Sequence, residues 1–182
     1  MTPEEVQQQM TSLLTNFNTE AAKALLSVAM NGVVYTKERV QEKGVKTDGT
    51  SFKGYSVNPL PLYFHEKQAT SSQMTRLKQN KKYKKDGLSY LDFRRETGKQ
   101  VGFKDLTFSG DMWRQTGIVQ ETSQSGNIQI VVGGLTEEAK QKHAWMTRQQ
   151  GDYLNLTDQE LNLQKQDLQE EIDSIVKKYL LI

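Results

Sequence analysis

The chain has 182 residues, a formal net charge of +2, 35% hydrophobic residues and a mean hydropathy of −0.71. This length fits one domain with one compact core, and the small net charge does not by itself indicate a nucleic-acid partner. The absence of cysteine excludes disulfides, a thiolate nucleophile and cysteine-ligated metal sites. The low hydrophobic content indicates an elongated subunit whose helices face water or other subunits.

The apolar runs of the chain are short. None approaches the roughly 18–20 apolar residues that a membrane-spanning helix needs. The N-terminus also lacks the basic-then-apolar order of a signal peptide. We therefore expect a soluble protein with no membrane partner that stays in the compartment where it is made.

The N-terminal region, residues 1–44, reads as helical. Thr2 caps a helix that begins at Pro3. Apolar residues then recur at the spacing of one helical stripe, at Val6, Met10, Leu13, Leu14 and Phe17. A second helix, or a continuation of the first past 18–20, covers 21–42 and ends at Gly44. Its centre is apolar on nearly every side, which predicts the most enclosed helix of the fold.

The middle of the chain is predicted to be irregular and then basic. Residues 45–64 contain turn and proline signals that predict loops and short extended pieces. Residues 65–88 are expected to form an exposed basic loop or a solvated helical arm. Six basic residues lie there without an intervening acid: Arg76, Lys78, Lys81, Lys82, Lys84 and Lys85. An ordinary solvated segment is the plainer interpretation; a DNA-facing surface is the sharper one.

Short elements fill the region after residue 88. Ser89 caps a short helix that stops at Gly98. We expect a strand over 103–108, followed by a brief helix capped by Ser109 that places Met112 and Trp113 in the core. A hairpin should follow, with strands over 118–122 and 127–132 on either side of Ser125 and Gly126.

Two helices close the chain. The first starts after Thr136, places Ala139, His143 and Met146 on one face, and stops at Gly151. The second starts with a Thr157–Glu160 capping box. Its early half, 162–167, is polar and expected to face solvent. An apolar stripe completes it, at Leu168, Ile172, Ile175, Val176 and Tyr179.

These elements predict an α+β fold in which a small antiparallel sheet packs with long N-terminal and C-terminal helices. We expect a single domain over residues 1–182. Its parts are the helical region 1–44, the basic loop or arm 65–88, and the sheet with the C-terminal helices over 89–182.

Motifs for catalysis are lacking. No phosphate-binding GxxxxGK[ST] or GxGxxG segment occurs, and no serine has a nucleophile-elbow context. His65 and His143 lie far apart, without neighbouring carboxylates at metal-ligand spacing. A site assembled from His143 and Asp111 has no motif behind it. We therefore expect no catalytic residues, no cofactor and no metal.

Two blocks carry a resemblance to a known family. The first runs Asp48-Gly49-Thr50-Ser51-Phe52 with Tyr55-Ser56 after it. The second is Asp105 to Trp113, which resembles an Asp-Leu-Thr-x-[Thr/Ser]-Gly-x-Met segment. Ala139 to Gly151 and Leu154 to Glu160 are similar to the family's last two helices, although Asp152-Tyr153-Leu154-Asn155 stands where the commoner pattern has a Pro-Arg-Pro-Phe element. These pieces resemble the neck and tail-completion, or virion morphogenesis, proteins of tailed bacteriophages.

The resemblance implies a structural virion protein that is not an enzyme. Such a protein would form a cyclic ring of six or twelve copies between portal and tail, in contact with portal, adaptor or tail proteins and with the genomic DNA. It would be assembled in the cytoplasm of the bacterial host. The motif that carries the likeness would form a structural corner, through Asp105, Leu106, Thr107, Ser109, Gly110, Met112 and Trp113. The alternative is a phage-encoded nucleic-acid-binding protein that uses the basic segment 76–85.

Overall fold

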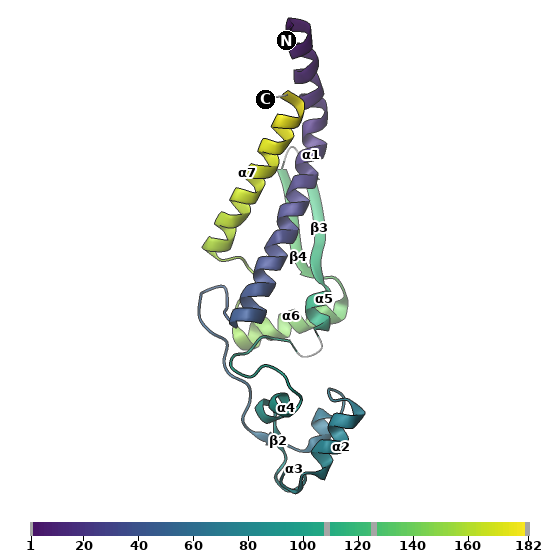
Figure 1. The fold of residues 1–182 in the computed structure, drawn as a ribbon, viewed down its shortest axis with the longest axis vertical. Coiled ribbons are helices and arrows are strands. Elements are labelled where there is room, and N and C mark those ends of the chain that lie inside the picture. The colour runs from purple at the N-terminus through teal and green to yellow at the C-terminus, as the bar shows by residue number, and fades with distance from the viewer. Residues whose placement is uncertain (1, 108–109, 125–126, 181–182) are drawn as a thin grey trace.

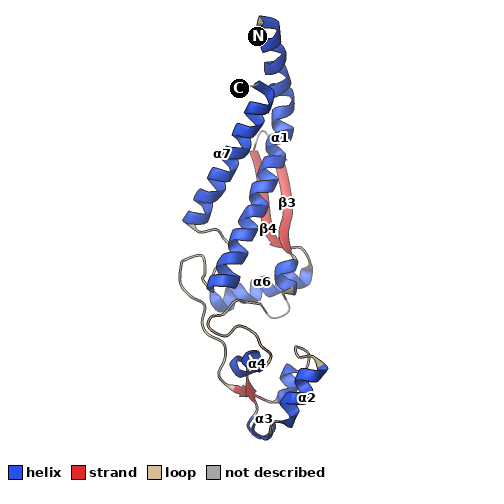
Figure 2. Ribbon diagram, in the orientation of Figure 1, coloured by secondary structure: helices blue, strands red, loops and turns tan. Residues whose placement is uncertain are grey.

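The computed structural model describes residues 2–107, 110–124 and 127–180 of an elongated, two-part molecule (Figure 1). The larger part, here the body, contains α1 (Pro3–Glu38), α5 (Asp111–Arg114), β3 (Thr116–Gln124), β4 (Asn127–Gly134), α6 (Glu137–Gln150) and α7 (Asp158–Leu180). The smaller part, here the lobe, contains β1 (Pro59–Leu60), the 3₁₀ turn η2 (Leu62–His65), α2 (Ser71–Gln79), α3 (Lys81–Asp86), β2 (Leu88–Ser89) and α4 (Tyr90–Glu96). The α+β prediction is confirmed, with long terminal helices and two small antiparallel sheets (Figure 2).

Helix α1 is one continuous helix, so the expected break near residues 18–20 does not occur. Thr2 and Glu5 form a capping box at its start, which satisfies backbone N–H groups that a helix leaves unpaired. At its end a π-helical turn, η1 (Arg39–Lys43), leads to Gly44, which has φ +64°. The central part is enclosed on one side only, less than predicted: Ala24, Val28 and Val33 are buried, whereas Met30 and Val34 are exposed.

Helix α7 packs along α1 with the opposite chain direction (Figure 1). Its early half does not simply face solvent as expected, because two of its polar side chains bond to α1. Gln164 donates to the Val28 carbonyl at 3.0 Å, and Asp167 accepts from Asn31 at 2.9 Å and Tyr35 at 2.7 Å. Gly32 lies at this close approach: a Cβ there would lie 2.2 Å from the Gln164 amide nitrogen, so the Gln164 side chain would have to move.

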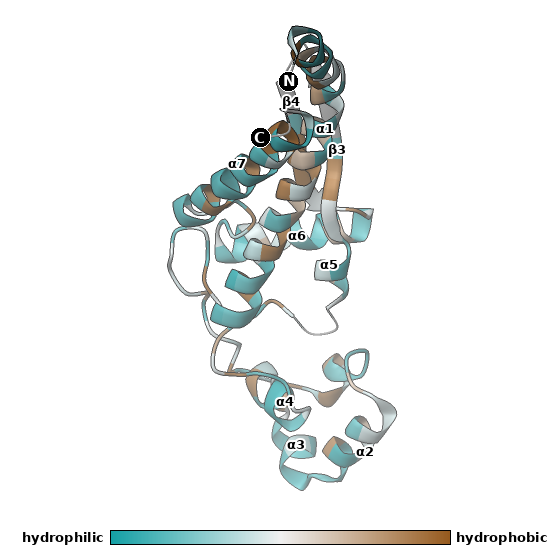
Figure 3. Cartoon of the chain, turned by 45° about the horizontal axis from the view of Figure 1, so that its top comes forward, coloured by the Kyte–Doolittle hydropathy of each residue, from teal (hydrophilic) through white to brown (hydrophobic). Residues whose placement is uncertain are grey.

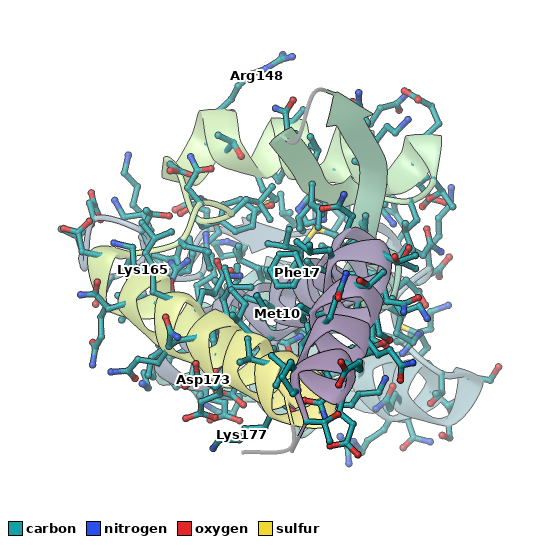
Figure 4. All side chains as sticks on the ribbon, turned by 90° about the horizontal axis from the view of Figure 1, so that it is seen from above. Met10, Phe17, Arg148, Lys165, Asp173 and Lys177 are labelled. Carbon is teal, nitrogen blue, oxygen red and sulfur yellow. The ribbon has the colours of Figure 1, made fainter. Side chains whose placement is uncertain are left out.

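The predicted hairpin is confirmed. Strands β3 and β4 pair antiparallel from Thr116 opposite Gly134 to Gln124 opposite Asn127, with an irregularity between Ile118 and Gln120. The turn at 125–126 lies outside the described residues. Viewed from the end of the molecule, the hairpin and α7 lie on different sides of α1 (Figure 4). The hairpin and α7 thus both use α1 as their support.

The lobe has a hydrophobic core of its own. Met74, Leu77, Leu88 and Phe93 are buried together. Segment 71–86 is therefore two short helices rather than a loop; Thr70 caps α2 and Asn80 caps α3. The division of the chain into domains stays a prediction.

The expected strand over 103–108 is wrong for its described part, because residues 103–107 are irregular. Leu106 has φ +52°, which a β-strand cannot contain. The brief helix that follows is confirmed as α5, with Gly110 at its N-cap position. Ser109, the expected cap, lies outside the described residues.

Candidate functional site

A buried polar network, here the joint, connects the lobe to the body. Arg94 on α4 is 1% exposed. Its Nη2 lies 2.9 Å from an Asp105 carboxylate oxygen, its Nε donates to the Gln100 carbonyl at 2.9 Å, and its Nη1 donates to the Thr107 carbonyl at 2.5 Å. The guanidinium therefore has its charge paired and most of its donors used, as burial requires.

Tyr55 completes the joint from the segment that leads into the lobe. Its hydroxyl donates to Asp105 at 2.7 Å and accepts from the Asp105 backbone N–H at 3.1 Å. The Arg94 guanidinium lies 4.3 Å from the centre of the Tyr55 ring, a cation–π contact. Burial, followed by the hydrogen bond to Asp105, raises the pKa of the Tyr55 hydroxyl. The group is therefore a neutral donor at physiological pH.

The motif residues form this joint instead of a strand corner. Asp105 also accepts from the Thr107 backbone N–H at 2.9 Å, which closes a local turn around Leu106. Thr107 in turn accepts from the Gln41 side chain of η1 at 2.9 Å. Asp105 thus links Arg94 of the lobe to Tyr55, and Thr107 beside it adds a bond to η1 at the end of α1. A positive φ at a leucine is uncommon and is held here by the bonds on both sides.

Trp113 confirms its expected place in the core. It is 3% exposed and packs with Val40, Phe52 and Tyr153 in the main cluster of the body. Met112 is half-buried against the same cluster. Of the seven motif residues, six are described, and all six lie in the joint or beside this core.

A pocket of about 490 Å³ lies where body and lobe meet. Its lining comes from α4, α5 and α6, from residues 55–56 that lead into the lobe, and from the bend at residues 104–107. Its apolar lining consists of Tyr55, Tyr90, Leu106, Met112, Trp145 and Met146. Trp145 at its edge is 59% exposed. Exposed tryptophan beside an apolar hollow is typical of a binding surface.

Lysines flank this pocket. Lys104 and Lys142 line it, and Lys142 pairs with Glu138 at 2.6 Å. Burial and the nearby charge of Lys53 lower the pKa of Lys104. Across the described ranges, Lys53 and Lys104 form no ion pair. An anionic group at this edge would therefore relieve an existing repulsion.

The six predicted basic residues are all exposed on α2 and α3, which the structure brings together at the far end of the lobe (Figure 3). Arg76 donates to the Glu96 carbonyl and Lys78 pairs with Glu66 at 2.7 Å. In the described part of the chain no ion pair involves the other four: Lys81, Lys82, Lys84 and Lys85. Tyr83 between them is half-buried and bonds Glu96, so its ring is not a free stacking surface.

His143 lies in a buried hydrogen-bond chain. The Thr116 hydroxyl donates to the Met112 carbonyl, so it accepts from His143 Nε2 at 2.8 Å. The other ring nitrogen, Nδ1, then accepts from the Tyr153 hydroxyl at 2.8 Å. Burial lowers the pKa of His143. Both nitrogens are occupied and the ring is 4% exposed, which gives no support to a site built on it.

Asp111, the other member of that candidate pair, forms an ion pair with Arg114 at the surface. Over residues 2–107, 110–124 and 127–180, the structure contains no group of three or more His, Cys, Asp or Glu side chains able to hold a metal ion. None of the described helices combines the length and the hydropathy that a bilayer span requires. The absence of catalysis and of a cofactor stays a prediction.

The first turns of α1 form a second uncovered surface. Residues 3–17 are here called the tip, and its N-terminal end projects beyond the C-terminal end of α7 (Figure 1). Val6, Met10 and Leu14 are 45%, 48% and 72% exposed. The stripe that was expected to pack is therefore only partly covered, since of its residues Leu13 and Phe17 alone are half-buried.

Comparison with models of protein families, with curated proteins and with solved structures finds no significant match to this chain. The resemblance to phage neck proteins therefore rests on the sequence motifs. Sequence reasoning found the basic residues, the tip stripe and Asp105. It did not identify Tyr55 and Arg94 as the partners of Asp105, and it did not identify the lysines and Trp145 of the pocket. These residues lie on separate elements, so no local sequence pattern connects them.

Proposed function

We propose that this protein is a structural virion protein of a tailed phage, a neck or tail-completion subunit that forms a ring between portal and tail. The observation that carries the proposal is the tip. The tip is about four turns of helix. It has three large apolar side chains exposed, and its N-terminal end extends beyond α7. A helix of this length is marginal by itself in water, so contact with a neighbouring subunit would stabilise it.

Two further features support the same reading. The molecule is long and thin, with distinct surfaces at its two ends, which suits head-to-tail contacts that close into a ring. The buried bonds of the joint, from Arg94 and Tyr55 to Asp105, hold the lobe in a fixed position on the body, as a structural subunit needs. The portal, adaptor or tail proteins and the host cytoplasm, as the place of assembly, belong to this proposal.

The mass of the purified protein in solution tests the proposal. Light scattering after size-exclusion chromatography should give a hexamer or a dodecamer, either alone or after addition of portal and tail proteins from the same phage. Electron microscopy of that fraction should show rings with a central opening. A protein that stays monomeric with every such partner, and that is missing from purified virions, would refute the ring.

A second function, nucleic-acid binding by the lobe, rests on the four unpaired lysines of α3. In a ring the same surface would contact the passing DNA; in a monomer it would be the whole function. If these lysines neutralise about four phosphates, the logarithm of affinity should fall with the logarithm of salt concentration with a slope near −3.6.

Fluorescence anisotropy with a duplex of random sequence measures that slope. The variant that changes Lys81, Lys82, Lys84 and Lys85 to Glu should lose binding. The control changes two exposed lysines of the body, Lys165 and Lys177, to Glu and should bind the duplex as before. Duplex binding by a monomer that never assembles would favour the second function over the ring.

A further inference from the structure

The tip of α1 is chemically distinctive. It carries the carboxylates of Glu4 and Glu5 and no lysine or arginine. Its exposed apolar residues lie at i, i+4 and i+8, so they form one stripe on the helix. An amphipathic helix of this kind binds by laying its apolar stripe into a hydrophobic groove.

The negative charge of the tip limits the kinds of surface that it can bind. An acidic segment is repelled by DNA phosphates and by anionic lipid headgroups, so neither is a suitable partner. It requires an apolar hollow with positive charge at the edge. The pocket between body and lobe has both properties. Its lining is aromatic and methionine-rich, and Lys104 lies in it. Lys53 lies near enough to Lys104 for its charge to lower the pKa of that amine.

The tip cannot reach the pocket of its own chain. Helix α1 runs without interruption from the tip to η1. The pocket is lined by residues of α4, α5 and α6, and these helices lie at the opposite end of α1 from the tip (Figure 1). Only a second molecule can bring the two surfaces together. Because the surfaces differ, each copy would offer a tip to one neighbour and a pocket to the other, which is a heterologous contact.

We propose that the tip of one copy docks in the pocket between body and lobe of a second copy of this chain. Met10 and Leu14 contact Trp145 and Met146, and Glu4 lies toward Lys104. The inference rests on the proposed ring function and specifies the contact that builds it. It also accounts for the exposure of Trp145, which a neighbour would cover.

Disulfide trapping tests the contact directly, because the natural chain has no cysteine. A variant with Met10→Cys and Trp145→Cys should, on mild oxidation, give a ladder of linked oligomers that disappears with reductant. Each single variant should give at most a dimer. The matched control joins Met10→Cys to Lys81→Cys, an exposed position outside the pocket, and should give no ladder.

A second measurement avoids any effect of the cysteines. Met10→Glu and Leu14→Glu should each weaken self-association by about tenfold or more, as expected for a central apolar anchor. Their melting temperatures as monomers should not change, because both side chains are exposed. Ser12→Glu, on the opposite side of the same helix, should leave association unchanged within about twofold.

The outcomes separate this inference from the ring itself. Rings that form without a Met10–Trp145 ladder above the control would overturn the docking and leave the ring function standing. If Met10→Glu assembles normally but no longer binds a portal or tail protein, the tip contacts that partner and the self-docking is wrong. A chain that never assembles under any of these conditions would overturn both.

Discussion

Substitution of Arg39 by methionine should be among the most destabilising single changes in this protein. Arg39 lies in η1 and is 7% exposed. Its Nε lies 2.8 Å from Glu160, and its Nη2 donates to the Asn155 carbonyl at 2.8 Å and the Tyr153 carbonyl at 3.3 Å. One side chain thus connects the end of α1 to the start of α7 and to the segment before it.

The expected loss follows from what methionine would leave behind. Glu160 would remain as a buried carboxylate without a cation, and removal of one partner from a buried pair costs about 3–5 kcal/mol. For a chain of this length about 1 kcal/mol shifts the melting temperature by about 2–4 °C, so we expect a fall of roughly 6–20 °C. Adding Glu160→Gln should recover part of that loss, because the unpaired charge is then gone.

Urea unfolding followed by far-UV circular dichroism measures the four members of this double-mutant cycle. Arg95→Met is the control, since Arg95 pairs with Asp92 on the surface with 60% of its side chain exposed. It should change the unfolding free energy by no more than about 0.5 kcal/mol. A loss below about 1 kcal/mol in Arg39→Met, or a double variant less stable than Arg39→Met, would refute the reasoning.

Three other predictions concern the body. Trp113→Ala should lower the unfolding free energy by about 3–5 kcal/mol through core truncation, and normal melting in calorimetry would contradict this. Because burial lowers the folded-state pKa of His143, stability should be full above the unfolded value near 6.5 and fall as pH drops below it; urea midpoints between pH 5 and 8 would show this, and a flat profile would not fit. Gly44→Ala should cost more than about 1 kcal/mol in urea unfolding, because its φ is +64° and the new Cβ would meet Phe103 at 2.4 Å, whereas Gly54→Ala, with open space around it, should be neutral.

Elements with strong local signals were predictable from the sequence. The capped starts at Thr2 and Thr157 appear where expected, because a capping box depends on residues only three positions apart. The hairpin was predictable for the same reason, since alternation and a turn signal are both local. Residues 71–86 were harder, because their many lysines concealed the apolar pair Met74 and Leu77 that buries one face of α2.

The candidate site depends on contacts that no local pattern encodes. Arg94 and Asp105 are eleven positions apart and meet only because 103–107 bends around the guanidinium. The same bend explains why the predicted strand over 103–108 is wrong for 103–107: the buried Arg94 guanidinium needs the Asp105 carboxylate and the Thr107 carbonyl as partners, and the chain turns to supply them. Gln164 and Asp167 were expected in water on the grounds of polarity, but each forms hydrogen bonds with α1. Polar residues that serve another helix cannot be told from solvated ones by sequence alone.

The π-helical turn η1 sets the direction in which α1 leaves the rest of the molecule. With a rise of about 1.5 Å per residue, its 36 residues span about 54 Å, so a rotation of 10° at η1 would carry the far end through about 9 Å. A one-residue insertion or deletion at η1 would therefore change the direction of the whole of α1 without changing any residue of the tip or of the pocket. In such an insertion or deletion the direction of α1 would be set by a five-residue turn of which only Arg39 and Val40 are buried.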